Sequence, residues 1–174
     1  MTELLVLCTG NAARSVMAGF MLDHLAEGRP DPLHVVTAGT HTIDGQPMSM
    51  RTRTALSRIP ELAATDFRVH RSRQVYEEDF RRAELVVVME ADHVRFVRRQ
   101  FAAYADKTGM LRRLSVDLPP APPDLSTRVA ALGLATVAIE DRDDVLDPAG
   151  HDGDVYGKVV DELWELCQAL ITRL

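Results

Sequence analysis

Residues 8–15 of this chain read Cys-Thr-Gly-Asn-Ala-Ala-Arg-Ser. An apolar run at residues 4–7 precedes this stretch and an amphipathic stretch follows it, so the order predicts a strand, a short loop and a helix. The N–H groups of such a loop, the helix N-terminus and the Arg14 guanidinium together bind a tetrahedral anion. Because the same groups stabilise a thiolate, the stretch predicts that Cys8 is a nucleophile inside an oxyanion site.

The small and polar residues of this loop have predicted roles of their own. Gly10 and Asn11 tolerate the positive φ angles that a loop with inward-pointing N–H groups requires. The planar fork of Arg14 pairs with two oxygens of a phosphate at once. Ser15 can donate a hydrogen bond to the Cys8 sulfur, and it can also be an ordinary helix N-cap.

The spacing of a cysteine, five residues and an arginine occurs a second time, at Cys167 and Arg173. This second copy contains no glycine and follows no predicted strand. It belongs to an apolar stripe with helical spacing, formed by Val159, Leu163, Cys167, Leu170 and Leu174. We therefore predict that Cys167 packs in the core as a small hydrophobic residue.

The loop resembles the phosphate-binding loop of the low-molecular-weight protein tyrosine phosphatases, whose fold is shared by the thioredoxin-coupled type of arsenate reductase. Four further segments are similar to motifs of that family: Val-Thr-Ala-Gly-Thr at 36–40, His-Arg-Ser-Arg-Gln-Val at 70–75, Val-Val-Val-Met-Glu at 86–90, and Asp147-Pro148. The resemblance covers residues 1–112 and 145–174. It implies one α/β domain over residues 1–174, an open parallel sheet flanked by helices, with residues 116–145 as an insertion.

The resemblance also implies an activity, the hydrolysis of phosphomonoesters, with protein phosphotyrosine as the first candidate substrate. Cys8 would carry a thiophosphate intermediate, Arg14 would bind the phosphate and Asp147 would be the general acid. The residues expected to bind phosphate are Thr9, Gly10, Asn11, Ala12, Ala13, Arg14 and Ser15. No metal and no cofactor is expected.

In the resembling family a hydroxyl and an imidazole hold the asparagine side chain of the loop. The residues expected to support the loop here are Asn11, Ser15, Thr37 and His70. A solvated His70 among neighbouring arginines is the alternative.

The Asp147 assignment also has competitors. Asp31-Pro32 is a second Asp-Pro turn, and further carboxylates precede Asp147 at Asp141, Asp143 and Asp144. We prefer Asp147 because it lies just ahead of the predicted closing helix, as the acid does in the family.

Several positions depart from the pattern of tyrosine-specific members. Ala149 and Gly150 stand where those members place an aromatic pair, and the loop at 40–47 has no aromatic ring, although His41 or Ile43 can pack against a substrate. Ala12 stands where tyrosine-specific members often carry a larger aliphatic residue and arginine-specific members a threonine. These departures leave the preference for phosphotyrosine open.

Two other functions remain as alternatives. An arsenate reductase uses the same loop but passes oxidising equivalents along further cysteines, and Ala13 replaces the second cysteine found in many relatives. Only a mechanism that borrows an external thiol would therefore serve here. The other alternative is a phosphate-binding protein without catalysis, which the presence of Cys8, Arg14 and Ser15 disfavours.

Composition limits the remaining possibilities. The chain has 174 residues, 46% of them hydrophobic, which suits one domain with a sizeable core. No segment approaches the roughly 20 apolar residues that cross a membrane, so we expect a cytoplasmic protein without a membrane partner. A net charge of −6 disfavours general nucleic-acid binding, and two cysteines do not suggest a disulfide framework. The sequence does not determine the oligomeric state.

Hydrophobic periodicity and turn residues predict alternating strands and helices. Extended segments are expected at residues 2–7, 33–37, 67–69, 85–89, 111–116 and 135–139. Helices are expected at residues 15–27, 47–58, 77–82, 91–104 and 154–174, with a short helix capped by Asp124 and ending at Leu132. The segment 116–145 is interpreted as a lid over the site, or equally as a surface excursion or a dimer contact.

Overall fold

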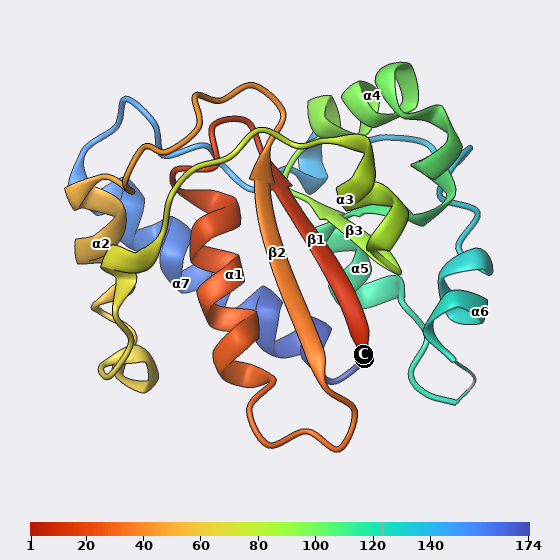
Figure 1. Cartoon of the computed structure of the whole chain (residues 1–174), viewed down its shortest axis with the longest axis horizontal. Helices are drawn as coiled ribbons and strands as arrows, with labels where there is room; N and C mark the ends of the chain where they lie inside the picture. Colours follow the sequence, from red (N-terminus) through yellow and green to blue (C-terminus); the bar gives the residue numbers. More distant parts are fainter. Residues whose placement is uncertain (123) are drawn as a thin grey trace.

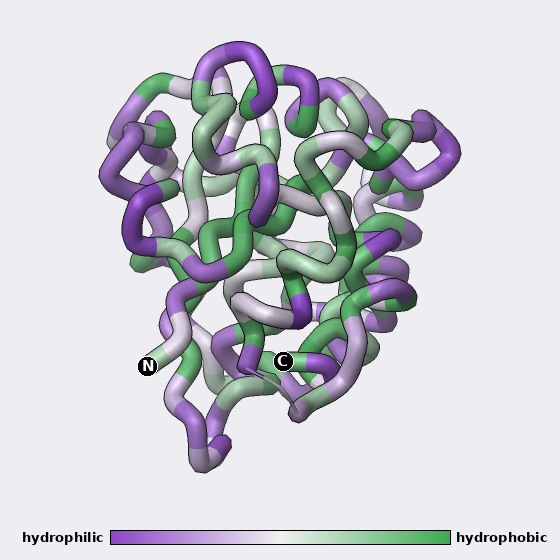
Figure 2. Tube along the Cα trace, turned by 90° about the vertical axis from the view of Figure 1, so that its right-hand side faces the viewer, coloured by the Kyte–Doolittle hydropathy of each residue, from purple (hydrophilic) through white to green (hydrophobic). Residues whose placement is uncertain are grey.

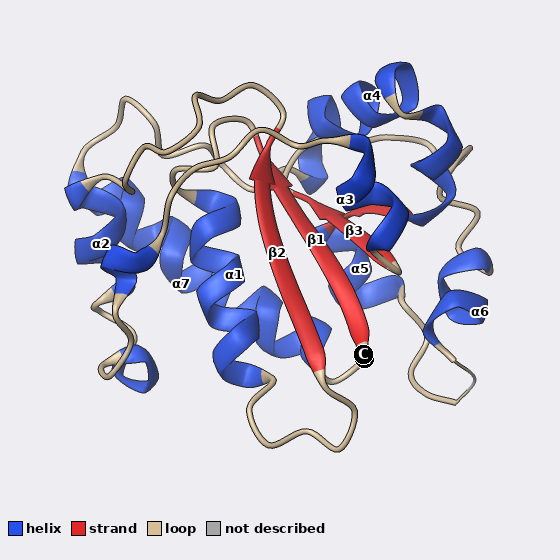
Figure 3. Cartoon of the chain, viewed as in Figure 1, coloured by secondary structure: helices blue, strands red, loops and turns tan. Residues whose placement is uncertain are grey.

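Four parallel strands form the central sheet, which is drawn in red in Figure 3. In chain order they are β1 (Thr2–Cys8), β2 (Leu33–Gly39), β3 (Leu85–Val88) and β4 (Thr108–Met110), and their order across the sheet is β2-β1-β3-β4. The computed structural model describes residues 1–122 and 124–174. The predicted open parallel α/β sheet is confirmed, and its strands all end at the edge that carries Cys8.

Helices cover both faces of the sheet (Figure 1). One face packs against α1 (Arg14–Leu25), α2 (Met50–Leu56), α5 (Leu111–Asp117) and α7 (Gly153–Ile171). The other packs against α3 (Glu77–Arg82) and α4 (Ala91–Gln100). Because side chains alternate along a strand, Leu4 and Val6 of β1 enter the first layer and Leu5 and Leu7 enter the second. Burial on both faces explains why the strands read as continuous apolar runs.

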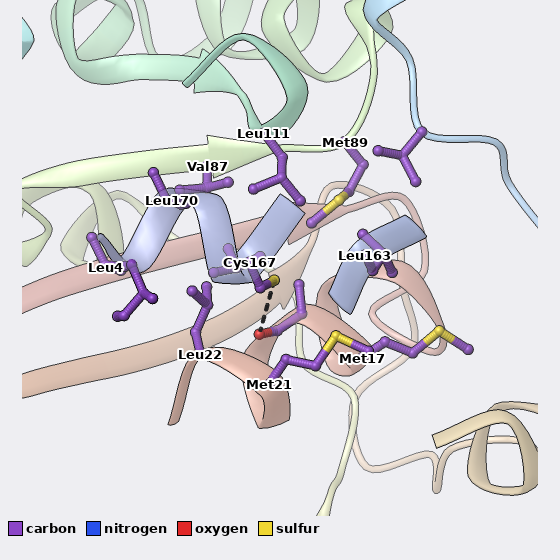
Figure 4. Packing of buried hydrophobic residues seen from close by; sticks show 14 of the residues in the cluster. Leu4, Met17, Met21, Leu22, Val87, Met89, Leu111, Leu163, Cys167 and Leu170 are labelled. Carbon is purple, nitrogen blue, oxygen red and sulfur yellow. Dashed lines mark hydrogen bonds between the residues drawn. The ribbon is translucent and has the colours of Figure 1, made fainter. Parts of the chain in front are cut away.

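Cys167 lies in the layer between the sheet and α7, as predicted (Figure 4). Its side chain is fully buried, and its thiol lies 3.9 Å from the Ala18 carbonyl oxygen of α1. Burial raises the pKa of this thiol, because the apolar surroundings disfavour a thiolate. Both cysteines are free.

The prediction of an edge strand at 111–116 is wrong, because this segment forms helix α5. The strand lies just before it, at β4. Leu111, Leu114 and Leu118 all point into the core, which is helical spacing, whereas Val116 is exposed. A side chain at Gly109 would lie 2.9 Å from a methyl group of Leu114, so glycine permits the tight passage from β4 into α5.

Two further extended segments were also mispredicted. Residues Phe67–Val69 form a short 3₁₀ helix capped by Asp66, and residues 135–139 form no strand because the N–H groups of Thr136 and Val137 both turn back to the Gly133 carbonyl. The helix expected at 91–104 ends at Gln100 and is followed by a 3₁₀ helix at Ala102–Lys107.

The segment 116–145 contains α6 (Leu125–Ala130), which Asp124 caps as predicted. In Figure 1, α6 lies at the end of the sheet opposite the carboxyl ends of β1 and β2. Arg128 anchors it there by donating to the Pro119 carbonyl at 2.9 Å and to the backbone of Arg173. Helix α6 is therefore not a lid over the Cys8 loop. Only the last residues of the segment return to the edge where the strands end.

Figure 2 shows hydrophobic chain in the interior and hydrophilic chain on the outer loops, with both termini at the end away from the Cys8 loop. In the part of the chain that the structure describes, no helix is long and apolar enough to cross a membrane.

Candidate active site

The loop after β1 turns its carbonyl groups outward. Each carbonyl oxygen of residues 9–13 accepts a hydrogen bond, in chain order from the His41 N–H (2.9 Å), the Thr42 hydroxyl (2.7 Å), the His70 imidazole (2.9 Å), the Thr52 hydroxyl (2.9 Å) and the Met17 N–H (2.8 Å). Among the described residues, no backbone N–H of residues 10–15 donates a hydrogen bond. These amides therefore remain on the inner side of the loop, where an anion can accept from them.

Asn11 holds the shape of the loop from its centre. It is buried and has a φ of 47°, the left-handed conformation that asparagine tolerates. Its side-chain amide donates to Thr37 Oγ1 at 3.0 Å and to Ser15 Oγ at 3.1 Å, and its Oδ1 accepts from the Arg73 N–H at 3.0 Å. Thr37 therefore contacts the Asn11 side chain as expected.

His70 differs in detail from the expectation. Its Nε2 donates to the backbone carbonyl of Asn11 and not to the side chain, which is already occupied by three other partners. Burial lowers the pKa of His70, so the ring is neutral near pH 7. His70 therefore contacts the backbone of the loop, and its ring is half-buried and not fully solvated.

Cys8 ends β1 at the floor of the loop and is 3% exposed. Its Sγ lies 3.0 Å from Ser15 Oγ. Since the Ser15 oxygen accepts from Asn11, its own proton is free to point at the sulfur. Ser15 is not the N-cap of α1, because that position belongs to Ala13, whose side chain makes no capping bond.

Arg14 begins α1 and is almost completely buried, with 1% exposure. Its Nη1 pairs with the Glu90 carboxylate and donates to the Val145 carbonyl at 3.0 Å. Its Nη2 lies 2.7 Å from Asp147 Oδ2. A buried cation requires such partners, and Glu90 was not among the predicted residues. Glu90 lies two residues after the end of β3, at the edge where ligands bind in open α/β sheets, and this position is the sequence signal that would have identified it.

Asp147 is the only one of the competing aspartates that reaches Arg14 in the described part of the chain. It is 43% exposed and lies at the mouth of the site. The others have different partners: Asp144 accepts from the Ala91 N–H, Asp141 pairs with Arg95, and Asp143 lies near Arg113. The other Asp-Pro turn lies at the opposite end of the sheet, where the Pro32 carbonyl accepts from the first residue of β1.

A depression surrounds Cys8 and Arg14. Its other lining residues are Gly10, Ala12, Ala13, Ser49, Thr52, Asp147, Ala149 and Tyr156. A groove beside it shares Gly10 and Ala12 and is lined further by His41 and Ile43, the latter 73% exposed. Ala149 therefore adds no aromatic ring to the wall, and Tyr156 is the aromatic residue that lines this depression. Among the described residues, no cluster of three or more histidine, cysteine or acidic side chains is placed to hold a metal ion.

Comparison with known proteins agrees with this geometry. The sequence model of the family "Low molecular weight phosphotyrosine protein phosphatase" matches residues 3–118. The chain is 28% identical to a protein-arginine-phosphatase of Bacillus subtilis (strain 168), covering 99% of this chain and 96% of that protein.

Solved structures are similar over nearly the whole chain. A low molecular weight protein tyrosine phosphatase from T. tengcongensis has a TM-score of 0.78 at 26% identity, with 100% of both chains covered. A YwlE arginine phosphatase, a cysteine-to-serine mutant with a phosphorylated active site serine, has a TM-score of 0.76 at 25% identity, covering 97% of this chain and 93% of that one. The family model alone matches more than half of the chain. The chain therefore belongs to the low molecular weight phosphotyrosine protein phosphatase family and is a phosphatase, a phosphomonoester hydrolase of that type.

Proposed function

We propose that this phosphatase works by covalent catalysis on Cys8, with Arg14 binding the phosphate and Asp147 acting as general acid. The observation that carries the proposal is the loop itself. Its carbonyls are all engaged on the outside, its amides are left for an anion on the inside, and the Cys8 sulfur lies on its floor with the Ser15 hydroxyl 3.0 Å away.

In the first step the Cys8 thiolate forms a bond to phosphorus while the bond to the leaving oxygen breaks. Asp147 gives its proton to that oxygen, and the Arg14 fork and the loop amides stabilise the equatorial oxygens. In the second step Asp147 takes a proton from water, which attacks phosphorus and releases phosphate and the thiolate. The Ser15 hydroxyl stabilises the thiolate in both steps by donating to it.

In the proposed mechanism, Arg14 and Asp147 form their ion pair before substrate binds. A phosphate dianion is a stronger partner for the Arg14 Nη2 than one carboxylate, so its arrival would release Asp147 toward the leaving group. Asp147 is suited to this exchange because it is half-exposed at the mouth, whereas Glu90 keeps Nη1 in place beneath it.

The buried thiol of Cys167 argues against the arsenate reductase alternative. A relay cysteine must be accessible as a thiolate, and Cys167 is fully enclosed with a raised pKa. The contacts of Cys8 with Ser15 and of Arg14 with Asp147 likewise argue against a protein that only binds phosphate, because binding alone needs neither a nucleophile nor a general acid.

For the substrate we propose phosphotyrosine of proteins or a small phosphomonoester, with phosphoarginine as the second candidate. The second candidate is favoured by the arginine phosphatases among the similar proteins. It is disfavoured by Ala12, which offers no hydroxyl in the depression. The ratio of kcat/KM for phosphotyrosine and phosphoarginine peptides distinguishes them, and Ala12→Thr should move that ratio toward phosphoarginine. We further propose a cytoplasmic enzyme that binds neither nucleic acid nor membrane, given its net charge of −6.

Replacing each cysteine in turn tests the nucleophile. Cys8→Ser should abolish turnover of aryl phosphates, because a serine hydroxyl is a far weaker nucleophile than a thiolate. Cys167→Ser is the matched control and should lose stability while keeping kcat. A Cys8→Ser protein with near-native activity would refute the proposal.

A further inference from the structure

His93 is a buried histidine that the proposed mechanism does not use. It lies in the first turn of α4, three residues after Glu90, and is 2% exposed. Its ring lies between the end of β3 and the first residue of the Cys8 loop, so both of its nitrogens face groups of the site.

The surroundings fix which ring nitrogen carries the proton. Nδ1 lies 3.4 Å from the Met89 backbone nitrogen. An amide N–H can only donate, so Nδ1 accepts and the proton of the neutral ring is on Nε2. Burial, with the nearby Arg14 charge adding to it, lowers the pKa of His93 to about 3, so the ring is neutral at physiological pH.

The Nε2–H therefore has two acceptors in reach. One is the Thr9 hydroxyl oxygen at 3.0 Å, and the other is Glu90 Oε1 at 3.3 Å. Thr9 is the residue that follows Cys8, while the other carboxylate oxygen of Glu90 pairs with Arg14. One N–H group thus joins the start of the loop to the carboxylate that holds the arginine.

We propose that His93 is a positioning residue of this phosphatase, whose neutral Nε2–H aligns Thr9 and Glu90 so that the loop amides and the Arg14 guanidinium face the same bound oxyanion. This inference rests on the proposed function. A neutral donor suits the task, because a cationic ring would place a second positive charge beside Arg14 and compete with it for Glu90. Loss of the donor would leave Glu90 Oε1 without the His93 N–H. Glu90 would then hold Arg14 less firmly, and Arg14 could shift away from its substrate-binding position.

Two substitutions at this position separate hydrogen bonding from packing. His93→Phe keeps a buried ring but removes the donor, whereas His93→Gln keeps an N–H that can reach the same oxygens. We expect His93→Phe to weaken inhibition by inorganic phosphate and vanadate about tenfold, and His93→Gln to recover most of that loss. Alkylation of Cys8 by iodoacetamide, a neutral reagent that needs no oxyanion site, should change much less than phosphate affinity.

The matched control is His24→Phe. His24 also lies three residues from a glutamate, Glu27, but in the last turn of α1, away from the loop. It should leave phosphate and vanadate inhibition unchanged. Thr9→Val removes one acceptor of the Nε2–H without changing the core, and it should also weaken phosphate inhibition. This variant keeps the inference testable if His93→Phe does not fold. In a double-mutant cycle, Thr9→Val and His93→Phe should be non-additive, because each of them removes the same hydrogen bond.

Unchanged phosphate and vanadate inhibition in His93→Phe or in Thr9→Val, with the wild type active, would overturn the inference, as would a His93→Gln variant that recovers none of the loss. Failure of the proposed function looks different. In that case either the wild-type protein would not turn over aryl phosphates, or the Cys8→Ser protein would keep its activity.

Discussion

At the scale of single residues, the proposed chemistry depends on how Arg14 is held. Its guanidinium is buried and divides its two terminal nitrogens between Glu90 on the inside and Asp147 at the mouth. The inner pair fixes the guanidinium plane, and in the proposed mechanism the outer pair is exchanged for a phosphate. The inner carboxylate, Glu90, is accordingly less exposed (22%) than the outer one, Asp147 (43%).

Asp147→Asn tests the role of the outer carboxylate. Without a proton to give, the variant should lose about a hundred- to ten-thousand-fold in kcat for phenyl or alkyl phosphates. The loss should be much smaller for p-nitrophenyl phosphate, whose leaving group needs little protonation. Steady-state kinetics across a series of leaving groups measures this difference. Equal losses for all of them would mean that Asp147 only shapes the site.

Ala149→Tyr tests whether the missing ring limits the choice of substrate. Ala149 lines the depression, so a tyrosine there would offer a face for the substrate ring to stack on. KM for phosphotyrosine should fall about threefold to tenfold, while KM for a small aliphatic phosphate stays close to its original value. If both KM values respond alike, the ring wall must be sought at Ile43 in the adjoining groove.

At the scale of elements, the site is assembled where β1, β3 and the end of the segment 116–145 meet. The Val145 N–H donates to the Met89 carbonyl at 2.8 Å, and the Val145 carbonyl accepts from Arg14. One residue earlier, Asp144 accepts from the Ala91 N–H at 2.7 Å at the start of α4. These bonds place Asp147 beside Arg14 although the two are far apart in sequence.

Asp144→Ala tests this junction. Loss of the bond to the first turn of α4 should cost about 1 kcal/mol of unfolding free energy, or roughly 2–4 °C in Tm. It should also lower kcat/KM, because Val145 and Asp147 follow directly. Asp124→Ala removes the cap of α6, away from the site, and should lower Tm without changing kcat/KM. An Asp144→Ala variant that loses stability at unchanged kcat/KM would show that the junction does not position Asp147.

At the scale of the whole molecule, the sequence predicted those parts of the fold in which the hydrophobic periodicity and the turn or capping residues indicate the same element. The apolar run before Cys8, the stripe containing Cys167 and the cap at Asp124 all lie where they were predicted. The segment 111–116 was mispredicted because a short apolar run fits strand and helix periods alike, and only packing against the core decides between them.

Contacts between distant segments were the harder part of the site to predict. An ion pair joins Glu90 to Arg14, and a hydrogen bond joins His93 to Thr9. Both depend on β3 lying beside β1, and the order of strands in a sheet cannot be read from residue spacing. The loop residues themselves are contiguous, so their arrangement followed from the sequence. The position of α6 away from the site could not be predicted either, because it depends on its packing at the far end of the sheet.

The covalent intermediate is the central claim, and rapid acid quenching tests it most directly. Enzyme in turnover with p-nitrophenyl phosphate is quenched, digested and mapped by mass spectrometry, with Asp147→Asn included because it should slow hydrolysis of the intermediate. The account predicts phosphate on the peptide that contains Cys8, more of it in Asp147→Asn, and none on the peptide that contains Cys167. An active enzyme that carries no phosphate on Cys8, or carries it on another residue, would contradict the account.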